Sequence, residues 1–294
     1  MTNRPTSRFK TLCVHAGQHP DPTTGAIVTP IYQTSTYVQD ALGQHKGYEY
    51  SRTQNPTREA VEANIAALEG GKAGIAFASG MAAIDAVSTL LRAGDHVVVT
   101  ENTYGGTYRL FEQVGRRYQL DFSYVDTSDL TRTVAAMTPA TKMLFVETPA
   151  NPVLDLTDLA AAAEITRARD VAFVVDNTFA TPINQRPLDL GADLVVHSAT
   201  KFLGGHADAL GGTVCGGRDL VARIYHYREI TGAALDPTAA YLLLRGMKTL
   251  QLRIERQCRS ALTIARHLAD HPALARVHYP GLDSDPGHAV ARKQ

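Results

Sequence analysis

The chain has 294 residues, of which 44% are hydrophobic and 20% are charged, so it can bury one large core or two ordinary ones. Its 29 basic residues balance its 29 acidic ones, which leaves no overall field to draw it to nucleic acid or to an anionic membrane. The three cysteines, Cys13, Cys215 and Cys258, form no Cys-x-x-Cys pair, and the sequence has no apolar run that could span a bilayer and no secretory signal. We therefore expect a cytoplasmic protein that acts on small molecules.

The N-terminal residues predict an arm rather than an independent domain. Residues 14–51 are rich in Thr, Gln, Tyr, Gly and Pro and show little helical or strand periodicity. A helix then follows: Asn55 can cap it, Pro56 suits its first position, and apolar residues recur on one face before Gly70 ends it.

After this helix, short apolar strands alternate with amphipathic stretches. We predict strands over residues 75–78, 96–100, 142–147, 171–176 and 194–197, and helices over residues 81–91, 108–115 and 158–169. Such alternation predicts the α/β class, with a largely parallel sheet that has helices on both faces. Ligands of such sheets bind beyond the carboxyl ends of the strands. Polar residues gather at these ends: Asn102, Glu147, Asp176 and His197.

The C-terminal part predicts a long helix over residues 247–268 and an alternating strand over residues 275–279. A lone strand and a helical stub cannot bury a core of their own, so we expect the chain to be incomplete at its C-terminus. We expect three parts: an arm over residues 1–54, a large domain over residues 55–246, and a linking helix with the start of a smaller domain over residues 247–294.

Lys201 is the first candidate for catalysis. It lies in the run Ser198-Ala199-Thr200-Lys201, directly after a predicted buried strand, so we expect its side chain to point into the protein. Most lysines are solvated surface charges, but a buried lysine has a lowered pKa and becomes a nucleophilic amine. Asp176 ends another buried strand. A Schiff-base lysine together with an aspartate that faces a pyridine nitrogen is the arrangement that pyridoxal phosphate demands.

The turn at Ser79 and Gly80 predicts a phosphate site. It follows a strand and opens a helix, so the backbone N–H groups of Gly80 and Met81 can face an anion at the positive end of the helix dipole. A Ser-Gly turn alone more often serves only turn geometry. The glycine-rich motifs of dinucleotide and P-loop sites are absent, which disfavours a nicotinamide dehydrogenase. His197 and His206 have neither the spacing nor the thiolate partners of a metal site, and we expect no metal.

Two further loops bring an aromatic ring and an amide to the same edge. Tyr104, in Tyr104-Gly105-Gly106-Thr107, is either a half-exposed surface residue or a ring that stacks on a cofactor. Asn151, in the run from Glu147 to Pro152, either shapes a turn or hydrogen-bonds the cofactor's phenolic oxygen and the substrate carboxylate.

Six motifs follow one another along the chain: YEYSRTQNPTR at residues 48–58, SGMA at 79–82, YGGT at 104–107, ETPANP at 147–152, VDNTF at 175–179 and SATK at 198–201. Together they make the chain similar to the Cys/Met-metabolism family of pyridoxal-phosphate enzymes, from about Thr11 to the last residue. The resemblance implies an aminotransferase-like fold of type I. In this fold a mostly parallel seven-stranded sheet lies between helices, with an N-terminal arm and, here, a truncated C-terminal α+β domain.

The resemblance also implies roles for single residues. Lys201 would be the Schiff-base lysine, Asp176 would hold the pyridine nitrogen protonated, and Tyr104 would stack on the ring and serve as an acid or base. Asn151 would contact the phenolic oxygen. The phosphate would be held by Gly80, Met81, Ser198 and Thr200 and, from a neighbouring subunit, by Tyr50 and Arg52. The last two contacts imply a homodimer or homotetramer.

The reaction implied is γ-replacement or γ-elimination in trans-sulfuration. The stretch from Tyr104 to Arg109 looks like that of cystathionine γ-synthases and γ-lyases, in which the matching arginine receives a distal substrate carboxylate; Asn151 and Tyr50 are further candidates for substrate binding. Gly106 stands where methionine γ-lyases carry a cysteine, and Gly205-His206-Ala207-Asp208 looks less like the O-acetylhomoserine sulfhydrylases. We favour the synthase over the lyase. The alternative from a different class is a truncated subunit that binds the cofactor without catalysis.

Overall fold

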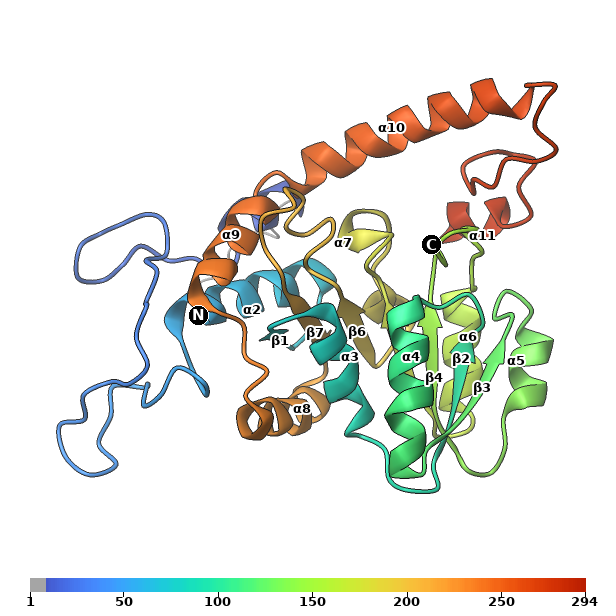
Figure 1. Cartoon of the computed structure of the whole chain (residues 1–294). Coiled ribbons are helices and arrows are strands. Elements are labelled where there is room, and N and C mark those ends of the chain that lie inside the picture. Colours follow the sequence, from blue (N-terminus) through green and yellow to red (C-terminus); the bar gives the residue numbers. More distant parts are fainter. Residues whose placement is uncertain (1–8) are drawn as a thin grey trace. The chain divides into compact units, whose positions relative to one another are not determined.

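The computed structural model describes residues 9–294 and has an α/β fold built on one seven-stranded sheet (Figure 1). The strands are β1 (Ala73–Phe77), β2 (His96–Thr100), β3 (Asp121–Val125), β4 (Thr141–Glu147), β5 (Ala172–Asp176), β6 (Leu194–His197) and β7 (Gly212–Gly216). Their order in the sheet is β1-β7-β6-β5-β4-β2-β3. β1 pairs with β7 in antiparallel fashion, whereas β2 pairs in parallel with β3 and β4, and β4 with β5. The predicted fold class is confirmed.

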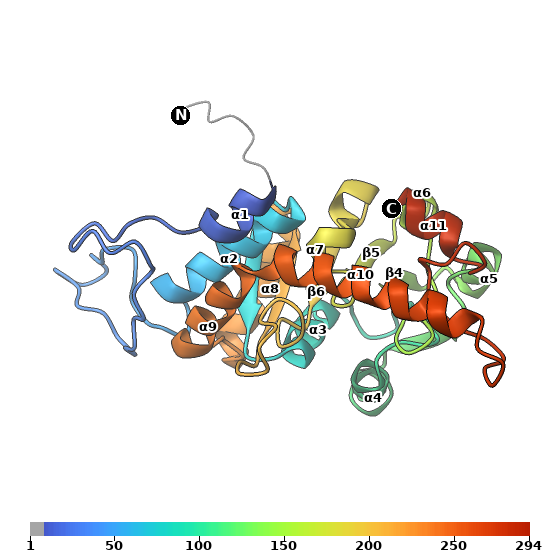
Figure 2. The same ribbon diagram turned by 90° about the horizontal axis from the view of Figure 1, so that it is seen from above.

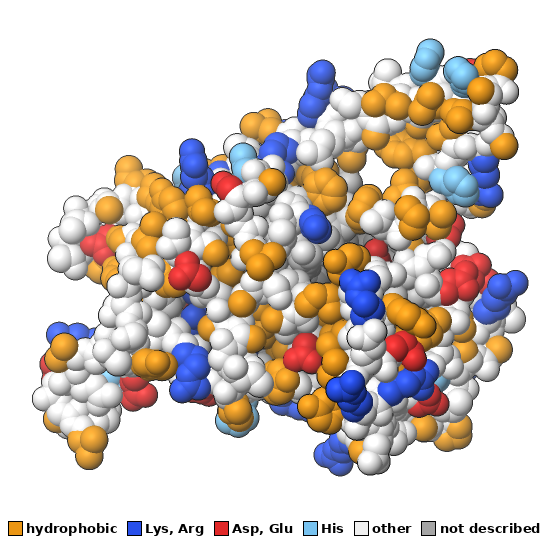
Figure 3. Space-filling view, viewed as in Figure 1, with side chains coloured by type: hydrophobic (Ala, Val, Ile, Leu, Met, Phe, Trp, Pro, Cys, Tyr) orange, Lys and Arg blue, Asp and Glu red, His pale blue; other side chains and the backbone are white. Residues whose placement is uncertain are grey.

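Helices connect these strands. They are α1 (Phe9–His15), α2 (Pro56–Glu69), α3 (Gly80–Ser88), α4 (Gly105–Gln113), α5 (Leu130–Ala136), α6 (Leu159–Arg167), α7 (Thr181–Asn184), α8 (Arg218–Thr231), α9 (Pro237–Met247), α10 (Leu250–Ala269) and α11 (His288–Lys293). No helix among residues 9–294 is both long and apolar enough to cross a membrane. Basic and acidic side chains are interspersed over the face shown in Figure 3, as the balanced charge of the sequence implies.

The chain divides into two compact units. The first comprises the described residues up to Leu90 together with Val196–Gln251, and the second comprises Leu91–Val195 together with Leu252–Gln294. The three parts expected from the sequence, with boundaries at residues 54 and 246, stay a prediction.

In the first unit, α2 begins and ends where the sequence predicts. The side chain of Asn55 accepts the backbone N–H of Thr57 at 3.0 Å, Pro56 occupies the first turn, and Gly70 ends the helix with a φ of 75°. Only glycine adopts that left-handed conformation without strain. Helix α1 packs on α2 (Figure 2), and Asn64 of α2 donates a hydrogen bond of 2.8 Å to the carbonyl of Ala16.

The N-terminal arm between α1 and α2 has no helix or strand beyond isolated bridges, as predicted. Several of its apolar side chains are exposed, including Ile27, Val38 and Leu42. A run of exposed apolar side chains is a common mark of a surface that another molecule covers. The contact of this arm with a neighbouring subunit stays a prediction.

In the second unit, the parallel strands are covered on both faces, which explains why they read as continuous apolar runs. On one face, Leu144 and Val146 of β4 pack with Leu159 of α6. On the other face, the ring of Phe145 meets that of Phe111 from α4 edge to face, with their centroids 5.6 Å apart. Neighbouring residues of one strand thus point to opposite layers.

The C-terminal stretch differs in part from the prediction. Helix α10 confirms the long helix expected over residues 247–268. The strand predicted over residues 275–279 is wrong, because these residues form turns and irregular backbone. An alternating pattern becomes a strand only where a neighbouring strand supplies hydrogen bonds, and no strand of the described chain pairs with this stretch.

Candidate active site

The first unit supplies a strand-to-helix turn that is suited to an anion. Ser79 caps α3, and its hydroxyl accepts the backbone N–H of Ala82 at 3.1 Å. The N–H groups of Gly80 and Met81, in the first turn of α3, have no acceptor among the described residues. Such first-turn N–H groups point outward along the helix axis, where the helix dipole favours a negative charge. The predicted turn is therefore present; its binding of a phosphate stays a prediction.

Ser198 and Thr200 lie in the turn after β6, against the start of α3. A Cβ atom added to Gly80 would lie 2.8 Å from the Cβ atom of Ser198, and one added to Gly212 would lie 2.2 Å from the carbonyl oxygen of Ser79. The hydroxyl of Thr200 donates to the carbonyl of Gly211 at 3.1 Å. The turns at Gly80 and Ser198 and the start of β7 at Gly212 therefore pack closely together and form a small cradle at the start of α3.

Replacing Gly212 with alanine is expected to disrupt this cradle. Because the new methyl group would overlap the backbone of Ser79 rather than a movable side chain, we expect a loss of unfolding free energy of about 1–3 kcal/mol and weaker binding of pyridoxal phosphate. Urea unfolding and a cofactor titration measure the two effects. Gly217→Ala is the matched control, since nothing lies within 4 Å of its added Cβ atom. Equal effects of the two substitutions would contradict the packing argument.

Lys201 is exposed, so the expectation that its side chain points into the protein is wrong. Strand β6 already ends at His197, and Lys201 lies in the following turn, where its N–H donates to the carbonyl of Ser198 at 3.1 Å. The buried side chain at this strand end is that of His197, whose Nε2 atom lies 2.6 Å from a carboxylate oxygen of Glu69. An exposed amine can be reached by a carbonyl compound from solution.

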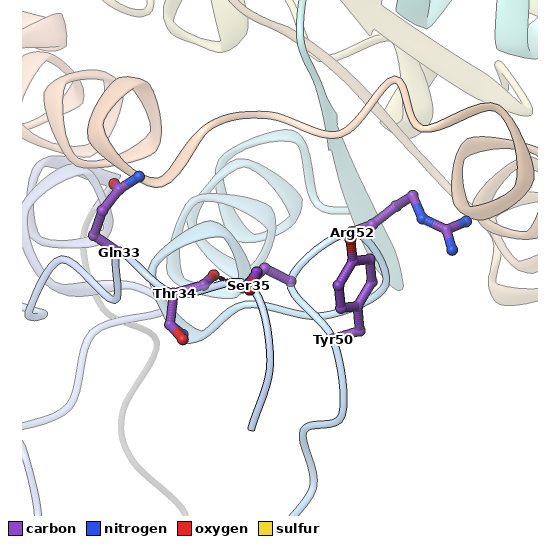
Figure 4. A pocket seen from close by; sticks show the side chains of 6 residues that line it. Gln33, Thr34, Ser35, Tyr50 and Arg52 are labelled. Atoms are coloured by element: carbon purple, nitrogen blue, oxygen red, sulfur yellow. Dashed lines mark hydrogen bonds between the residues drawn. The ribbon is translucent and has the colours of Figure 1, made fainter. Parts of the chain in front are cut away.

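Tyr50 and Arg52 lie on the arm and line a cavity of about 340 Å³ (Figure 4). The guanidinium of Arg52 lies 5.4 Å from the centroid of the Tyr50 ring and donates a hydrogen bond to the carbonyl of Glu229. Gln33, Thr34, Ser35 and Ser51 complete the lining. Both side chains are exposed on this chain, and their predicted contact with a neighbouring subunit's phosphate stays a prediction.

The second unit supplies two carboxylates side by side. Glu147 ends β4, Asp176 ends β5, and the two residues are paired across the parallel ladder. Their exposed fractions are 7% and 6%. Burial, followed by the charge of Asp176, raises the pKa of Glu147 to about 7. Asp176 accepts the backbone N–H of Thr178 at 3.0 Å.

Glu147 also brings together two of the predicted loops. One carboxylate oxygen accepts the backbone N–H of Tyr104 at 2.6 Å, and the other accepts that of Asn151 at 3.4 Å. The Tyr104 ring is half exposed, and Arg109 is exposed on α4. Sequence reasoning placed Glu147 at the polar edge but gave it no role. The hydrogen bonds of Glu147 go to backbone N–H groups, which do not depend on the type of residue. The only sign of its role in the sequence is therefore its position at the end of a predicted strand.

The raised pKa of Glu147 predicts that the chain without cofactor loses stability as the pH rises from about 4.5 to about 7. In this window the folded chain keeps a proton that the unfolded chain has lost, and deprotonation of the folded state removes this advantage. The loss is at most about 1.4 kcal/mol per pH unit. Urea unfolding at several pH values measures it. Glu147→Gln is expected to flatten the profile, and an unchanged slope in that variant would assign the titration to another group.

Each unit, taken by itself, carries groups that fit part of pyridoxal phosphate. In the first unit, the N–H groups at the start of α3 suit a phosphate and Lys201 offers an amine. In the second unit, buried Asp176 offers a carboxylate that suits a protonated pyridine nitrogen. No group of three or more His, Cys, Asp or Glu side chains within residues 9–294 is placed to hold a metal ion.

Comparison with known proteins identifies the family. A cystathionine β-lyase of Coxiella burnetii is 51% identical over 99% of this chain and 76% of that protein, and a cystathionine γ-synthase of Mycobacterium tuberculosis is 48% identical over 97% of this chain and 74% of that protein. The crystal structure of cystathionine γ-lyase from Lactobacillus plantarum complexed with L-serine superposes with a TM-score of 0.96, at 47% identity, over 98% of this chain and 76% of that one. The model of the Cys/Met metabolism PLP-dependent enzymes matches residues 10–294. The chain belongs to this family.

Proposed function

We propose that the chain is a trans-sulfuration enzyme that acts at the γ-carbon of an amino-acid substrate, as a cystathionine γ-synthase or γ-lyase. The observation that carries the proposal is the exposed amine of Lys201 in the same turn as Ser198, which packs on the Gly80 cradle. If the phosphate of pyridoxal phosphate were bound in that cradle, the carbonyl group of the cofactor would come within reach of this amine. Pyridoxal phosphate, when bound, supplies an electron sink for carbanion charge.

Different residues of this chain would then bind the phosphate and transfer protons. The Gly80 and Met81 amides and the Ser198 hydroxyl would donate hydrogen bonds to the phosphate. The Thr200 hydroxyl would do so by turning its hydrogen away from the carbonyl of Gly211. The free amine of Lys201 would accept the α-proton of the substrate and donate it again in a later proton transfer. This series of proton transfers requires a free amine rather than a permanent salt bridge.

The ring-facing side chains belong to the second unit. Asp176 would accept a hydrogen bond from the protonated pyridine nitrogen, and its burial strengthens that bond because no water competes for the carboxylate. Tyr104 would stack on the ring and use its phenol as an acid or base. Asn151 would hydrogen-bond the phenolic oxygen of the cofactor.

Substrate binding and assembly complete the proposal. Arg109, Asn151 and Tyr50 would receive substrate carboxylates, Arg109 the distal one. Tyr50 and Arg52 would cross to a neighbouring subunit in a homodimer or homotetramer, which is supported by the exposed apolar side chains of the arm. We place the enzyme in the cytoplasm, in keeping with its three unpaired cysteines.

Product analysis tests the reaction. Cystathionine cleaved at its γ-carbon gives cysteine, 2-oxobutyrate and ammonia, whereas an activated homoserine with cysteine gives cystathionine. We expect at least one of these conversions when the purified chain is supplied with pyridoxal phosphate. A chain that binds the cofactor and converts neither substrate would favour the alternative of a cofactor-binding subunit without catalysis.

The Coxiella burnetii relative, named a cystathionine β-lyase, supports a second candidate reaction. Cleavage at the β-carbon of cystathionine gives homocysteine, pyruvate and ammonia. The same assay separates it from the first proposal, because pyruvate and 2-oxobutyrate differ in mass by one methylene group.

A further inference from the structure

One buried carboxylate, that of Glu147, fastens both loops that carry the proposed ring contacts. Its Oε2 atom accepts the backbone N–H of Tyr104 at 2.6 Å and the hydroxyl of Thr103 at 3.4 Å. Its Oε1 atom accepts the backbone N–H of Asn151 at 3.4 Å. The Tyr104 loop follows β2, whereas the Asn151 loop follows β4. One side chain therefore sets the spacing of two separate loops.

The bond to Tyr104 also satisfies the backbone N–H of the residue at a helix start, as the glutamate of a capping box does. Tyr104 is the N-cap residue of α4, and its own side chain makes no capping hydrogen bond. The carboxylate of Glu147 binds the backbone at this helix start, where the helix dipole favours a negative charge. Above a pH of about 7 the carboxyl group of Glu147 is ionised, and a hydrogen bond to an ionised acceptor is shorter and stronger than one between neutral groups.

We propose that Glu147 is a positioning residue of the proposed site, which places the Tyr104 ring and the Asn151 amide by accepting one backbone N–H from each loop. The inference rests on the proposed function, because those two side chains are its ring contacts. A carboxylate suits the task because both of its oxygens accept, whereas a glutamine would turn an NH₂ group toward one of the N–H donors. Glu147 itself need not touch substrate or cofactor.

Variants of Glu147 test the proposal in the protein loaded with pyridoxal phosphate. Glu147→Ala removes both acceptors, and we expect the Tyr104 amide to exchange its hydrogen about ten- to a hundredfold faster. We also expect a smaller visible circular-dichroism band per bound cofactor and a lower kcat, because the ring contacts are no longer held in one geometry. Glu147→Gln keeps one acceptor and is expected to give intermediate values.

Glu101→Gln is the matched control, because Glu101 is an exposed glutamate directly after β2. It is expected to leave the exchange rate and the dichroism unchanged. A purely structural Glu147 would lower the melting temperature of its variants while exchange at Tyr104 and the dichroism per bound cofactor stayed as in the wild type, and that result would overturn the proposal.

The failure of the proposed function would look different. A wild-type chain that binds no pyridoxal phosphate contradicts the function, yet the exchange of the Tyr104 amide still decides whether Glu147 fastens the loop. Should Glu147→Ala fail to fold, Glu147→Gln carries the test, because glutamine has nearly the same shape. Exchange as slow in Glu147→Gln as in the wild type at both Tyr104 and Asn151 would overturn the positioning role.

Discussion

The Lys201→Ala variant is expected to lose the visible absorption band that the wild-type chain gains with pyridoxal phosphate and that borohydride reduces. The reason is that the band requires a covalent bond between the cofactor and this amine. Turnover is expected to fall on the order of 10³-fold or more, because the same amine is proposed to move the α-proton, and acid–base catalysis alone contributes that much. Absorption spectra and steady-state kinetics measure both effects.

The controls separate chemistry from folding. Lys201 is exposed, so its loss is expected to change the free energy of unfolding by no more than about 0.5 kcal/mol. Lys142→Ala removes another exposed lysine, near the start of β4 and away from Glu147 at its end, and is expected to keep both the band and the turnover. A reducible band that persists in Lys201→Ala would mean that another amine binds the cofactor, and the assignment of Lys201 would be wrong.

The sequence predicted those helices and strands whose start, end or apolar pattern is encoded in their own residues. Helix α2 carries its own start at Asn55 and its own stop at Gly70, and β4 is a long apolar run. Strands β3 and β7 were missed because neither is an apolar run: β3 contains Asp121 and Ser123, and β7 is rich in glycine. β7 (Gly212–Gly216) contains two glycines and is a strand because its backbone pairs with β1. The wrongly predicted strand over residues 275–279 is the opposite case: its residues alternate as in a strand, but no strand of the described chain pairs with it.

The sequence predicted those residues of the candidate site that are recognised by their side-chain type and by their position at a strand end or in a loop. Asp176 and Tyr104 stand where strand ends and loop composition placed them. The exposure of Lys201 was not predictable, because Lys201 lies in the turn after β6 and the apolar pattern of a strand does not fix the direction of a side chain in the following turn. The role of Glu147 depends on distances to backbone amides of two loops, and no pattern of side chains encodes such distances.

The segment that carries Tyr50 and Arg52 is held by two buried arginines, and this arrangement leads to the second large expected effect. Arg58 donates to the carbonyls of Ser51 and Thr53, each at 2.8 Å. Arg228 donates to the same Thr53 carbonyl at 3.0 Å. These three hydrogen bonds from buried arginines fix the backbone of the segment far more firmly than that of a surface loop.

A single glutamate, Glu62, pairs with both of these arginines. Glu62 forms ion pairs with Arg228 and, at 3.7 Å, with Arg58, and it accepts the backbone N–H of Ala76 at 2.9 Å. Arg228 is only 1% exposed. Burial and the neighbouring charge of Arg228 lower the pKa of Arg58, which shows that two cations share one partner at the cost of mutual repulsion.

Replacing Arg228 with methionine is expected to lower the free energy of unfolding by about 3–5 kcal/mol, because it breaks a buried ion pair and removes the hydrogen bonds of Arg228 to the carbonyls of Thr53 and Ala76. Urea unfolding followed by far-ultraviolet circular dichroism measures the loss. Arg223→Met, an exposed position of the same helix α8, is expected to stay within about 0.5 kcal/mol of the wild type.

The contribution of charge to this loss can be separated from that of the carbonyl bonds. In a Glu62→Gln background the carboxylate is already gone, so Arg228→Met is expected to cost less there, by a coupling energy of about 0.5–3 kcal/mol. If the cost is equal in both backgrounds, Arg228 acts through its bonds to the carbonyls of Thr53 and Ala76 rather than through Glu62. In either case, Arg228 holds the arm by its hydrogen bond to Thr53, the residue next to Arg52. Loss of Arg228 is therefore expected to lower the stability of the chain and also to weaken the binding of the cofactor by Arg52.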